Sequence, residues 1–263
     1  MSKKINNKKK GSKVGNIITN IILVIAIIVF LGSAVKLVTL LIPYYQGEKD
    51  YDKVKELAVM VETDDDLGAD EDEKGKFTVD FESLKEINPD TIGWIRFDEP
   101  SIISYPVVKS HDNKEYLTKT FSANDNKLGA IFMDKHNESD FSDRNTIIYG
   151  HNMRVGDQMF SQIRKYGNTE FRDENPYFYI YTPDNVEHKY RVFAAGVVRE
   201  DADNYKMKFA DDDEFARFLN LCKASNYDKS VELDMDSKIV TLSTCTCVNE
   251  YERFIVQGVL EED

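Results

Sequence analysis

Cysteine and histidine are scarce in this chain, whose 263 residues include three cysteines and four histidines. The odd number of cysteines argues against a disulfide framework and leaves at least one thiol free. Cys245 and Cys247 form a Cys-x-Cys pair, but no further cysteine or histidine stands at the spacing of a metal ligand set. The sequence therefore does not favour a metal-bound or disulfide-bound fold.

Positive charge is scarce after the first 36 residues, which hold seven lysines and no acid. The formal net charge is −13, so residues 37–263 taken alone carry −20. Nucleic-acid binding relies on clustered lysine and arginine, and we therefore expect no nucleic-acid partner. Much of the acid lies between Glu62 and Glu73, where apolar residues are almost absent, and this favours a solvated linker over a metal site.

A long apolar run occurs near the N-terminus. Residues 17–35 are almost wholly aliphatic, and the run continues to Ile42 after Lys36. About 20 apolar residues cross the hydrocarbon core of a bilayer, so residues 17–42 are predicted to be a transmembrane anchor. The lysines of residues 1–16 predict a basic cytoplasmic tail, which places the rest of the chain outside the cell. The small residues Gly32-Ser33-Ala34 leave a cleaved signal peptide as the alternative.

The remaining chain divides by composition into two parts. Residues 43–76 are predicted to hold a juxtamembrane helix, from Tyr51 to Val61, followed by the acidic linker. From Phe77 onward the composition is that of a globular domain, without an internal repeat or a Pro/Gly/Ser-rich linker. We therefore expect one extracellular domain over residues 77–263. Cys222 falls on an apolar helical face within it and is expected to be a buried packing residue.

Short runs rich in β-branched and aromatic residues follow a short helix expected near residues 81–87. These runs lie at residues 93–97, 105–108, 130–133, 146–149, 177–181, 190–198, 238–242 and 254–260. Their number and spacing predict an antiparallel barrel or sandwich. Two helical insertions are expected, near residues 158–165 and over residues 211–224. The second begins with four acidic residues, where the helix dipole favours negative charge.

Three of these runs begin or end on a chemically active side chain. Taken with their flanking residues, the run at 239–245 ends at Cys245, the run at 145–151 ends at His151, and the run at 253–260 begins with Arg253. A thiol, an imidazole and a guanidinium are the parts of a covalent acyl-transfer site. The alternatives are an inert core cysteine, a surface histidine and an arginine paired with Glu250 or Glu252.

The words around these three residues resemble the sortases, the cysteine transpeptidases of Gram-positive cell surfaces, and class B in particular. They are Thr241-Leu242-Ser243-Thr244-Cys245, Tyr149-Gly150-His151-Asn152-Met153 and the trailing Arg253. Three upstream words, at residues 88–95, 105–108 and 112–117, are also similar to class B sequence. The similarity covers about residues 77–260. It implies a mainly β fold with added helices, an eight-stranded sortase-type β-barrel preceded here by the transmembrane helix.

The resemblance also implies roles for individual residues. Cys245 would be the nucleophile, His151 the general acid and base, and Arg253 the group that stabilises the oxyanion or holds the substrate carbonyl. Five residues are candidates for substrate binding: Ser243, Thr244, Asn113, Leu117 and Tyr205. Asn152 would orient the histidine or end its strand. By motif register Cys247 is not the nucleophile, and a Cys245–Cys247 disulfide would silence the enzyme.

The function implied is that of a membrane-anchored cysteine transpeptidase. It would cleave a secreted protein after threonine in a C-terminal sorting motif of the NPxTx or xPxTG type. A thioacyl-enzyme would then pass the protein to an amine of a peptidoglycan precursor, without metal or other cofactor. One alternative is a pilin-polymerising sortase with a protein lysine as acceptor, although the Asp-Pro-Trp-like lid word of class C is absent. Another is a catalytically silent surface-binding module, which would not need all three active side chains.

Overall fold

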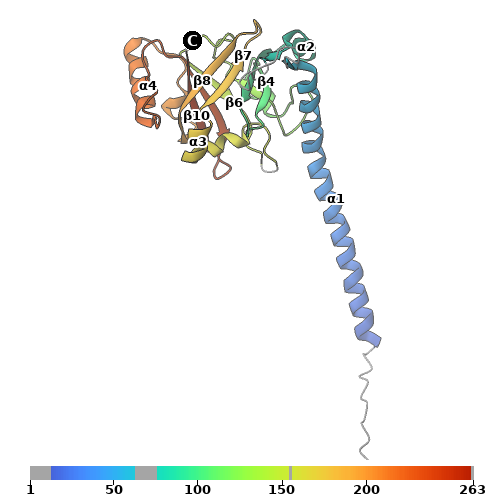
Figure 1. The fold of residues 1–263 in the computed structure, drawn as a ribbon. Helices are drawn as coiled ribbons and strands as arrows, with labels where there is room; N and C mark the ends of the chain where they lie inside the picture. The colour runs from blue at the N-terminus through green and yellow to red at the C-terminus, as the bar shows by residue number, and fades with distance from the viewer. Residues whose placement is uncertain (1–12, 63–75, 154–155, 262–263) are drawn as a thin grey trace, which may run out of the picture. The chain divides into compact units, whose positions relative to one another are not determined.

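The computed structural model describes residues 13–62, 76–153 and 156–261 (Figure 1). The chain divides into two compact units, one ending at Pro43 and the other beginning at Tyr44. The second unit therefore starts well before Phe77, where composition alone placed the start of the globular domain.

Helix α1 runs without a break over Lys13–Ala58. Its first part is long and apolar enough to cross a membrane, and the side chains of its most apolar window are not buried within the protein. A helix that is apolar on all sides requires an apolar environment around it. The length and composition of α1 therefore agree with the predicted anchor.

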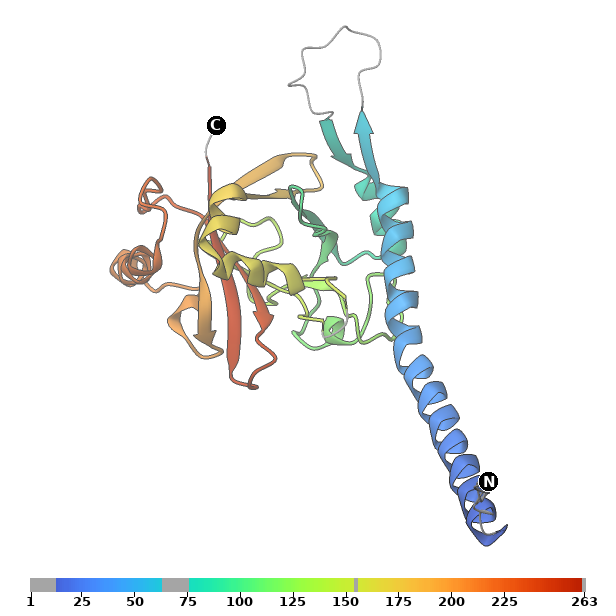
Figure 2. The ribbon, with the colours of Figure 1, turned by 60° about the horizontal axis from the view of Figure 1, so that its bottom comes forward.

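The juxtamembrane helix was predicted to extend to Val61, but α1 ends at Ala58 and strand β1 (Val59–Glu62) follows at once. The cause is local, because the valines of β1 pair antiparallel with strand β2 (Lys76–Val79). Figure 2 shows this two-stranded ribbon continuing from the end of α1. The segment that joins the two strands carries most of the predicted acidic linker and lies outside the described residues.

Eight further strands form a closed barrel, which confirms the predicted fold and excludes the sandwich. They are β3 (Thr91–Phe97), β4 (Ser104–Val108), β5 (Ile131–Met133), β6 (Asn145–Tyr149), β7 (Tyr177–Tyr181), β8 (Glu187–Arg199), β9 (Ile239–Cys245) and β10 (Glu252–Leu260). Around the barrel the order is β10-β8-β7-β3-β4-β5-β6-β9. Alternate residues of these strands fill the interior, among them the fully buried Ile95, Ile148 and Leu242.

The expectation of a wholly antiparallel sheet is wrong at two places. Strand β4 pairs parallel with β5, and β6 pairs parallel with β9. Parallel neighbours cannot be joined by a tight hairpin, and here long stretches of chain separate them. The stretch between β6 and β9 contains two other strands and most of the helices.

Helices cover the outside of the barrel. They are α2 (Phe81–Ile87), α3 (Thr169–Glu174) and α4 (Asp212–Ser225), with 3-10 turns η1 (Glu115–Leu117), η2 (Ser161–Gly167) and η3 (Asp203–Tyr205). The predictions of α2 and α4 are confirmed, whereas the insertion expected at 158–165 is the 3-10 helix η2 followed by α3. Helix α4 lies beside β8 (Figure 1), and Cys222 is buried in an apolar cluster with Phe215 and Phe218, as predicted.

Candidate active site

The strand register brings the three predicted catalytic side chains to one end of the barrel. Cys245 ends β9, and Arg253 is its direct partner on the antiparallel strand β10. On the other side of β9, the parallel strand β6 pairs Tyr149 with Ser243, and its last residues lead directly to His151. The amide of Gly150 donates to the Ser243 carbonyl at 3.1 Å and continues that pairing past the end of β6.

A cavity of about 230 Å³ lies where these strands end. Its walls are formed by Asn113, Leu117, Phe132, Tyr149, Gly150, His151, Ser243, Thr244, Cys245 and Arg253. Seven of the eight predicted site residues are therefore brought together. The eighth, Tyr205, contacts this wall from behind, because its hydroxyl is 2.7 Å from the Ser243 Oγ.

A larger cavity of about 430 Å³ lies elsewhere, along the end of β10 and the segment 230–238. Charged and polar side chains such as Arg191 and Glu261 line it, together with Val231, Val259 and Leu260. Its lining contains no cysteine or histidine. Of these two cavities, only the smaller has a lining with the thiol and the imidazole that acyl transfer needs.

His151 is held by a segment that the motif also marked. Its Nε2 is 2.7 Å from the Leu117 carbonyl oxygen, and since a carbonyl can only accept, Nε2 carries the proton. The Nδ1 atom is then free to exchange a proton with substrate. Gly129 has a φ of +65°, and a Cβ there would lie 2.7 Å from the His151 Cδ2. The imidazole is thus held by a hydrogen bond at Nε2 and by contact with Gly129 at Cδ2.

Asn152 joins the ends of two strands. Its Nδ2 donates to the Cys245 carbonyl at 2.7 Å, so it fixes the end of β9 against the chain that leaves β6. Sequence reasoning left its role open between orienting the histidine and ending the strand. Cys247 has a φ of 61°, and its Sγ is 3.7 Å from the Asn152 carbonyl. Since β9 ends at Cys245, the alternation that would place both cysteines on one face does not continue.

Arg253 is oriented by three contacts. Its Nη1 donates to the backbone carbonyls of Glu250 and Glu252, at 2.6 and 3.0 Å, and its Nη2 donates to the Glu200 carboxylate at 2.7 Å. The alternative pairing with the side chains of Glu250 or Glu252 does not occur. Within the described residues these bonds use three of the five guanidinium donors, so two are left for a substrate oxygen.

Glu200 is a site residue that sequence reasoning missed. It follows β8 directly, and its amide donates to the Tyr251 carbonyl at 2.9 Å. No motif marks it, because its position beside Arg253 depends on the pairing of β8 with β10. Its carboxylate compensates the guanidinium charge at the rim of the cavity.

Tyr205 and Ser243 share a hydrogen bond in which either oxygen can donate. Burial raises the pKa of Tyr205 to about 12, against a smaller lowering by the bond to Ser243, so the phenol stays neutral at physiological pH. Ser243 lies on the cavity face of β9 two residues before Cys245, as predicted. Thr244 is also buried, and its hydroxyl has no hydrogen-bond partner within the described residues.

Asn113 is anchored beneath the cavity by a buried carboxylate. Its Nδ2 donates to Asp134 at 2.7 Å, and the Tyr149 hydroxyl donates to the same oxygen at 2.9 Å. The other Asp134 oxygen accepts from the amide of His136. Burial, and then the charge of Asp134, raise the pKa of Tyr149, which therefore stays neutral. Asp134 and Tyr149 were not predicted as site residues, although Tyr149 stands in the word that contains His151.

Comparisons with known proteins agree with this geometry. The sortase domain model matches residues 98–261. Sortase B of Listeria monocytogenes is 32% identical over 189 residues, covering 71% of this chain and 76% of that protein. Sortase B of Staphylococcus aureus is 32% identical over 232 residues, covering 87% of this chain and 88% of that protein.

Solved structures show the same likeness. Sortase B from Bacillus anthracis, in complex with AAEK1, has a TM-score of 0.70 at 27% identity and covers 84% of this chain and 99% of its own. A Staphylococcus aureus sortase B–substrate complex has a TM-score of 0.63 at 30% identity and covers 69% of this chain and 84% of its own. The chain belongs to the sortase family, and these relatives are of class B. It is a sortase-type cysteine transpeptidase.

Proposed function

We propose that Cys245, His151 and Arg253 carry out a two-step acyl transfer in the cavity at the end of the barrel. The observation that supports this most strongly is the cross-strand pairing of Cys245 with Arg253, beside an imidazole whose Nε2 is fixed by Leu117. Nucleophile, oxyanion donor and proton carrier then stand on three neighbouring strands.

In the first step, the thiol proton of Cys245 has passed to Nδ1 of His151, and the thiolate attacks the carbonyl carbon of the threonine in the sorting motif. The new C–S bond forms as the carbonyl electrons move to oxygen, where the two remaining donors of Arg253 stabilise the negative charge. The C–N bond then breaks. His151 gives a proton from Nδ1 to the leaving amine, and a thioester remains on Cys245.

In the second step, an acceptor amine attacks the thioester carbonyl. His151 accepts the amine proton at Nδ1, the C–S bond breaks, and the electrons return to the Cys245 thiolate. A new amide bond joins the two molecules. Atoms and charge balance over the cycle without an oxidant, a metal or an organic cofactor.

The substrate would lie against the residues that line the cavity. Leu117 offers an exposed apolar side chain, and Asn113 is held by Asp134 at the same wall. The Ser243–Tyr205 pair supplies hydroxyl groups to the cavity, which Thr244 also lines. We assign the substrate as a C-terminal sorting motif of the NPxTx or xPxTG type on a secreted protein, and the acceptor as a peptidoglycan precursor amine.

We place the enzyme in the cell membrane as a single-pass protein. Residues 17–42 would form the anchor within α1, residues 1–16 a cytoplasmic tail, and the barrel would be extracellular. The lysines before the apolar run support this orientation, because positive charge favours the cytoplasmic side. In this arrangement the cavity meets secreted proteins and the cell wall.

Intact-protein mass spectrometry of the full-length protein in detergent tests the nucleophile and the motif together. Wild type, Cys245→Ala and Cys247→Ala would each be mixed with NPxTx and xPxTG peptides. We expect a thioacyl adduct in wild type and Cys247→Ala and none in Cys245→Ala. An adduct that persists in Cys245→Ala would place the nucleophile elsewhere. Adding a peptidoglycan stem-peptide amine or a lysine peptide identifies the acceptor and tests the pilin-polymerising alternative.

Thiol labelling tests the alternative that the protein is a surface-binding module without catalytic activity. Cys245 and Cys247 are exposed, whereas Cys222 is buried, and burial raises the pKa of the Cys222 thiol to about 12. Iodoacetamide between pH 7 and 9 should therefore label the first two and leave Cys222 untouched, since the thiolate is the reactive form. Absence of both labelling at Cys245 and adduct formation would favour the binding module.

A further inference from the structure

The end of α1 that belongs to the globular unit contacts the chain between η1 and β5. Tyr51 is 6% exposed, and its hydroxyl donates to the Gly129 carbonyl at 2.7 Å and accepts from the Phe121 amide at 3.1 Å. One phenol oxygen thus joins two distant backbone positions of the same segment. Burial raises the pKa of Tyr51, so the hydroxyl keeps the proton that it donates.

Two neighbours of Tyr51 on α1 hold the same segment. The Asp50 carboxylate accepts from the Asn124 Nδ2 at 3.2 Å. Gly47 lies so close to Leu128 that a Cβ there would be 2.8 Å from its Cδ2. Helix α1 therefore holds the segment 117–129 near its middle, at residues 121 and 124, and near its end, at residues 128 and 129. A shift of the helix would break these contacts together.

The segment that α1 holds is the one that holds the imidazole. Leu117 at its start accepts the proton of the His151 Nε2, and Gly129 at its end lies against the ring edge. The Ala130 amide donates to the Tyr116 carbonyl at 3.0 Å and keeps the start and end of the segment together. A displacement of Gly129 would therefore move the ring of His151 through direct contact. It would also move the Leu117 carbonyl that binds Nε2, through the bond between Ala130 and Tyr116.

We propose that Tyr51 is a positioning residue for His151, which couples the helix carrying the membrane anchor to proton transfer in the active site. This inference rests on the proposed role of His151. Without the Tyr51 hydroxyl, the Gly129 carbonyl and the Phe121 amide lose their shared partner, and the segment between them is free to move. The imidazole then occupies its reactive orientation for a smaller fraction of the time.

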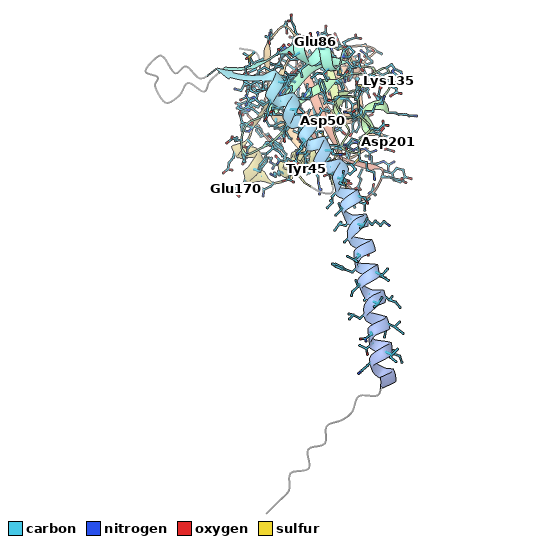
Figure 3. All side chains as sticks on the ribbon, turned by 90° about the vertical axis from the view of Figure 1, so that its right-hand side faces the viewer. Tyr45, Asp50, Glu86, Lys135, Glu170 and Asp201 are labelled. Atoms are coloured by element: carbon cyan, nitrogen blue, oxygen red, sulfur yellow. The ribbon has the colours of Figure 1, made fainter. Side chains whose placement is uncertain are left out.

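The test compares Tyr51→Phe with Tyr45→Phe in the full-length protein in detergent. Both changes remove one phenol hydroxyl from α1 and keep the ring. Tyr45 is a matched control, because it is 59% exposed and lies on the same helix a few residues before Asp50 (Figure 3). We expect Tyr51→Phe to lower kcat for peptide transfer about tenfold with little change in KM. Tyr45→Phe should match wild type.

A second readout follows the histidine without any substrate. In protein labelled with ¹⁵N-histidine, the Nε2 proton that His151 donates to Leu117 should exchange with solvent about tenfold faster in Tyr51→Phe than in wild type. A purely structural loss would lower the melting temperature and leave this exchange and kcat unchanged, which would overturn the inference. An equal loss in Tyr45→Phe would overturn it as well.

Two further outcomes are distinguishable. If Tyr51→Phe does not fold, Asp50→Ala replaces it, because it removes the acceptor of the Asn124 amide. A two- to threefold loss of kcat with faster exchange at Nε2 then supports the coupling, while wild-type values contradict it. If wild type itself forms no adduct with any peptide, the proposed function fails. The exchange of the His151 proton then still decides whether Tyr51 positions the imidazole.

Discussion

At the scale of single residues, Arg253 shows why a guanidinium is suited to this position. Its Nη1 donates to two backbone carbonyls and its Nη2 donates to Glu200, so the plane of the group is fixed before substrate arrives. A planar fork with five donors can make these bonds and still offer donors to an oxyanion. The ammonium group of a lysine has three donors on one nitrogen, so it cannot make these three bonds and also donate to an oxyanion.

Arg253→Lys should therefore lower kcat by about 10²- to 10³-fold, the usual loss when an oxyanion donor is removed. The measurement is steady-state peptide cleavage and transfer at saturating substrate. Arg191→Lys is the control, because Arg191 pairs with Asp228 beside the other cavity and should change kcat less than about twofold. Wild-type turnover in Arg253→Lys would remove Arg253 from the mechanism.

The sequence predicted the residues that carry reactive groups, but it missed two residues that orient their neighbours, Glu200 and Asp134. Cys245, His151 and Arg253 stand in recognisable words at the ends of apolar runs, and the barrel brings them together. Glu200 and Asp134 have ordinary sequence contexts. Their proximity to the site depends on which strands become neighbours, and local patterns do not contain that information.

At the scale of elements, α4 is stabilised by an ordered first turn. The Asp211 side chain accepts from the Glu214 amide at 2.8 Å and caps the helix. The apolar face of α4, including Cys222, then packs in a cluster with residues of β8, β9 and β10. Both the cap and the buried face could be predicted from sequence, because spacing along one helix defines them.

Asp211→Ala should lower the free energy of unfolding by about 1 kcal/mol, because an N-terminal amide of α4 loses its partner. Urea unfolding of the unit that begins at Tyr44 measures the change. Asp213→Ala in the same turn removes a charge without a cap and should lower stability by a few tenths of a kcal/mol. Equal effects of the two substitutions would show that charge, rather than capping, stabilises the helix start.

Strand partners and helix ends were harder to predict from the sequence than helix caps. The runs of β4, β5, β6 and β9 were recognised as strands, but their parallel neighbours were not, because alternation along a strand does not identify its partner. Likewise the spacing of Val54, Leu57 and Ala58 predicts a helix correctly, while the end at Ala58 depends on the pairing of β1 with β2.

At the scale of the whole molecule, the position of the domain boundary matters for any soluble form of the enzyme. Tyr51, Val54 and Ala58 are buried in the unit that contains the barrel. The composition changes at Phe77, but the packing begins on α1. Composition reports where acidic residues stop, whereas the boundary of a folded unit depends on which apolar side chains are covered.

A truncated form beginning at Tyr44 should therefore be more stable than one beginning at Phe77 by several kcal/mol, since the shorter form exposes the surface that three buried side chains of α1 cover. Differential scanning calorimetry of the two forms measures this difference. The shorter form should also turn over peptide more slowly, because it lacks Tyr51. Identical melting temperatures and turnover would show that α1 contributes nothing to the barrel.

The placement of β9 between β6 and β10 also determines when the enzyme can first act during its synthesis. His151 precedes Cys245 by 94 residues and Arg253 by 102, and these two lie on β9 and β10, the last strands that the structure describes. Contacts between such distant segments form late, after the entropy of the long intervening chain has been lost. A growing chain thus carries the imidazole of His151 before the thiol and the guanidinium have been made, and transfer activity begins when β9 and β10 complete the barrel.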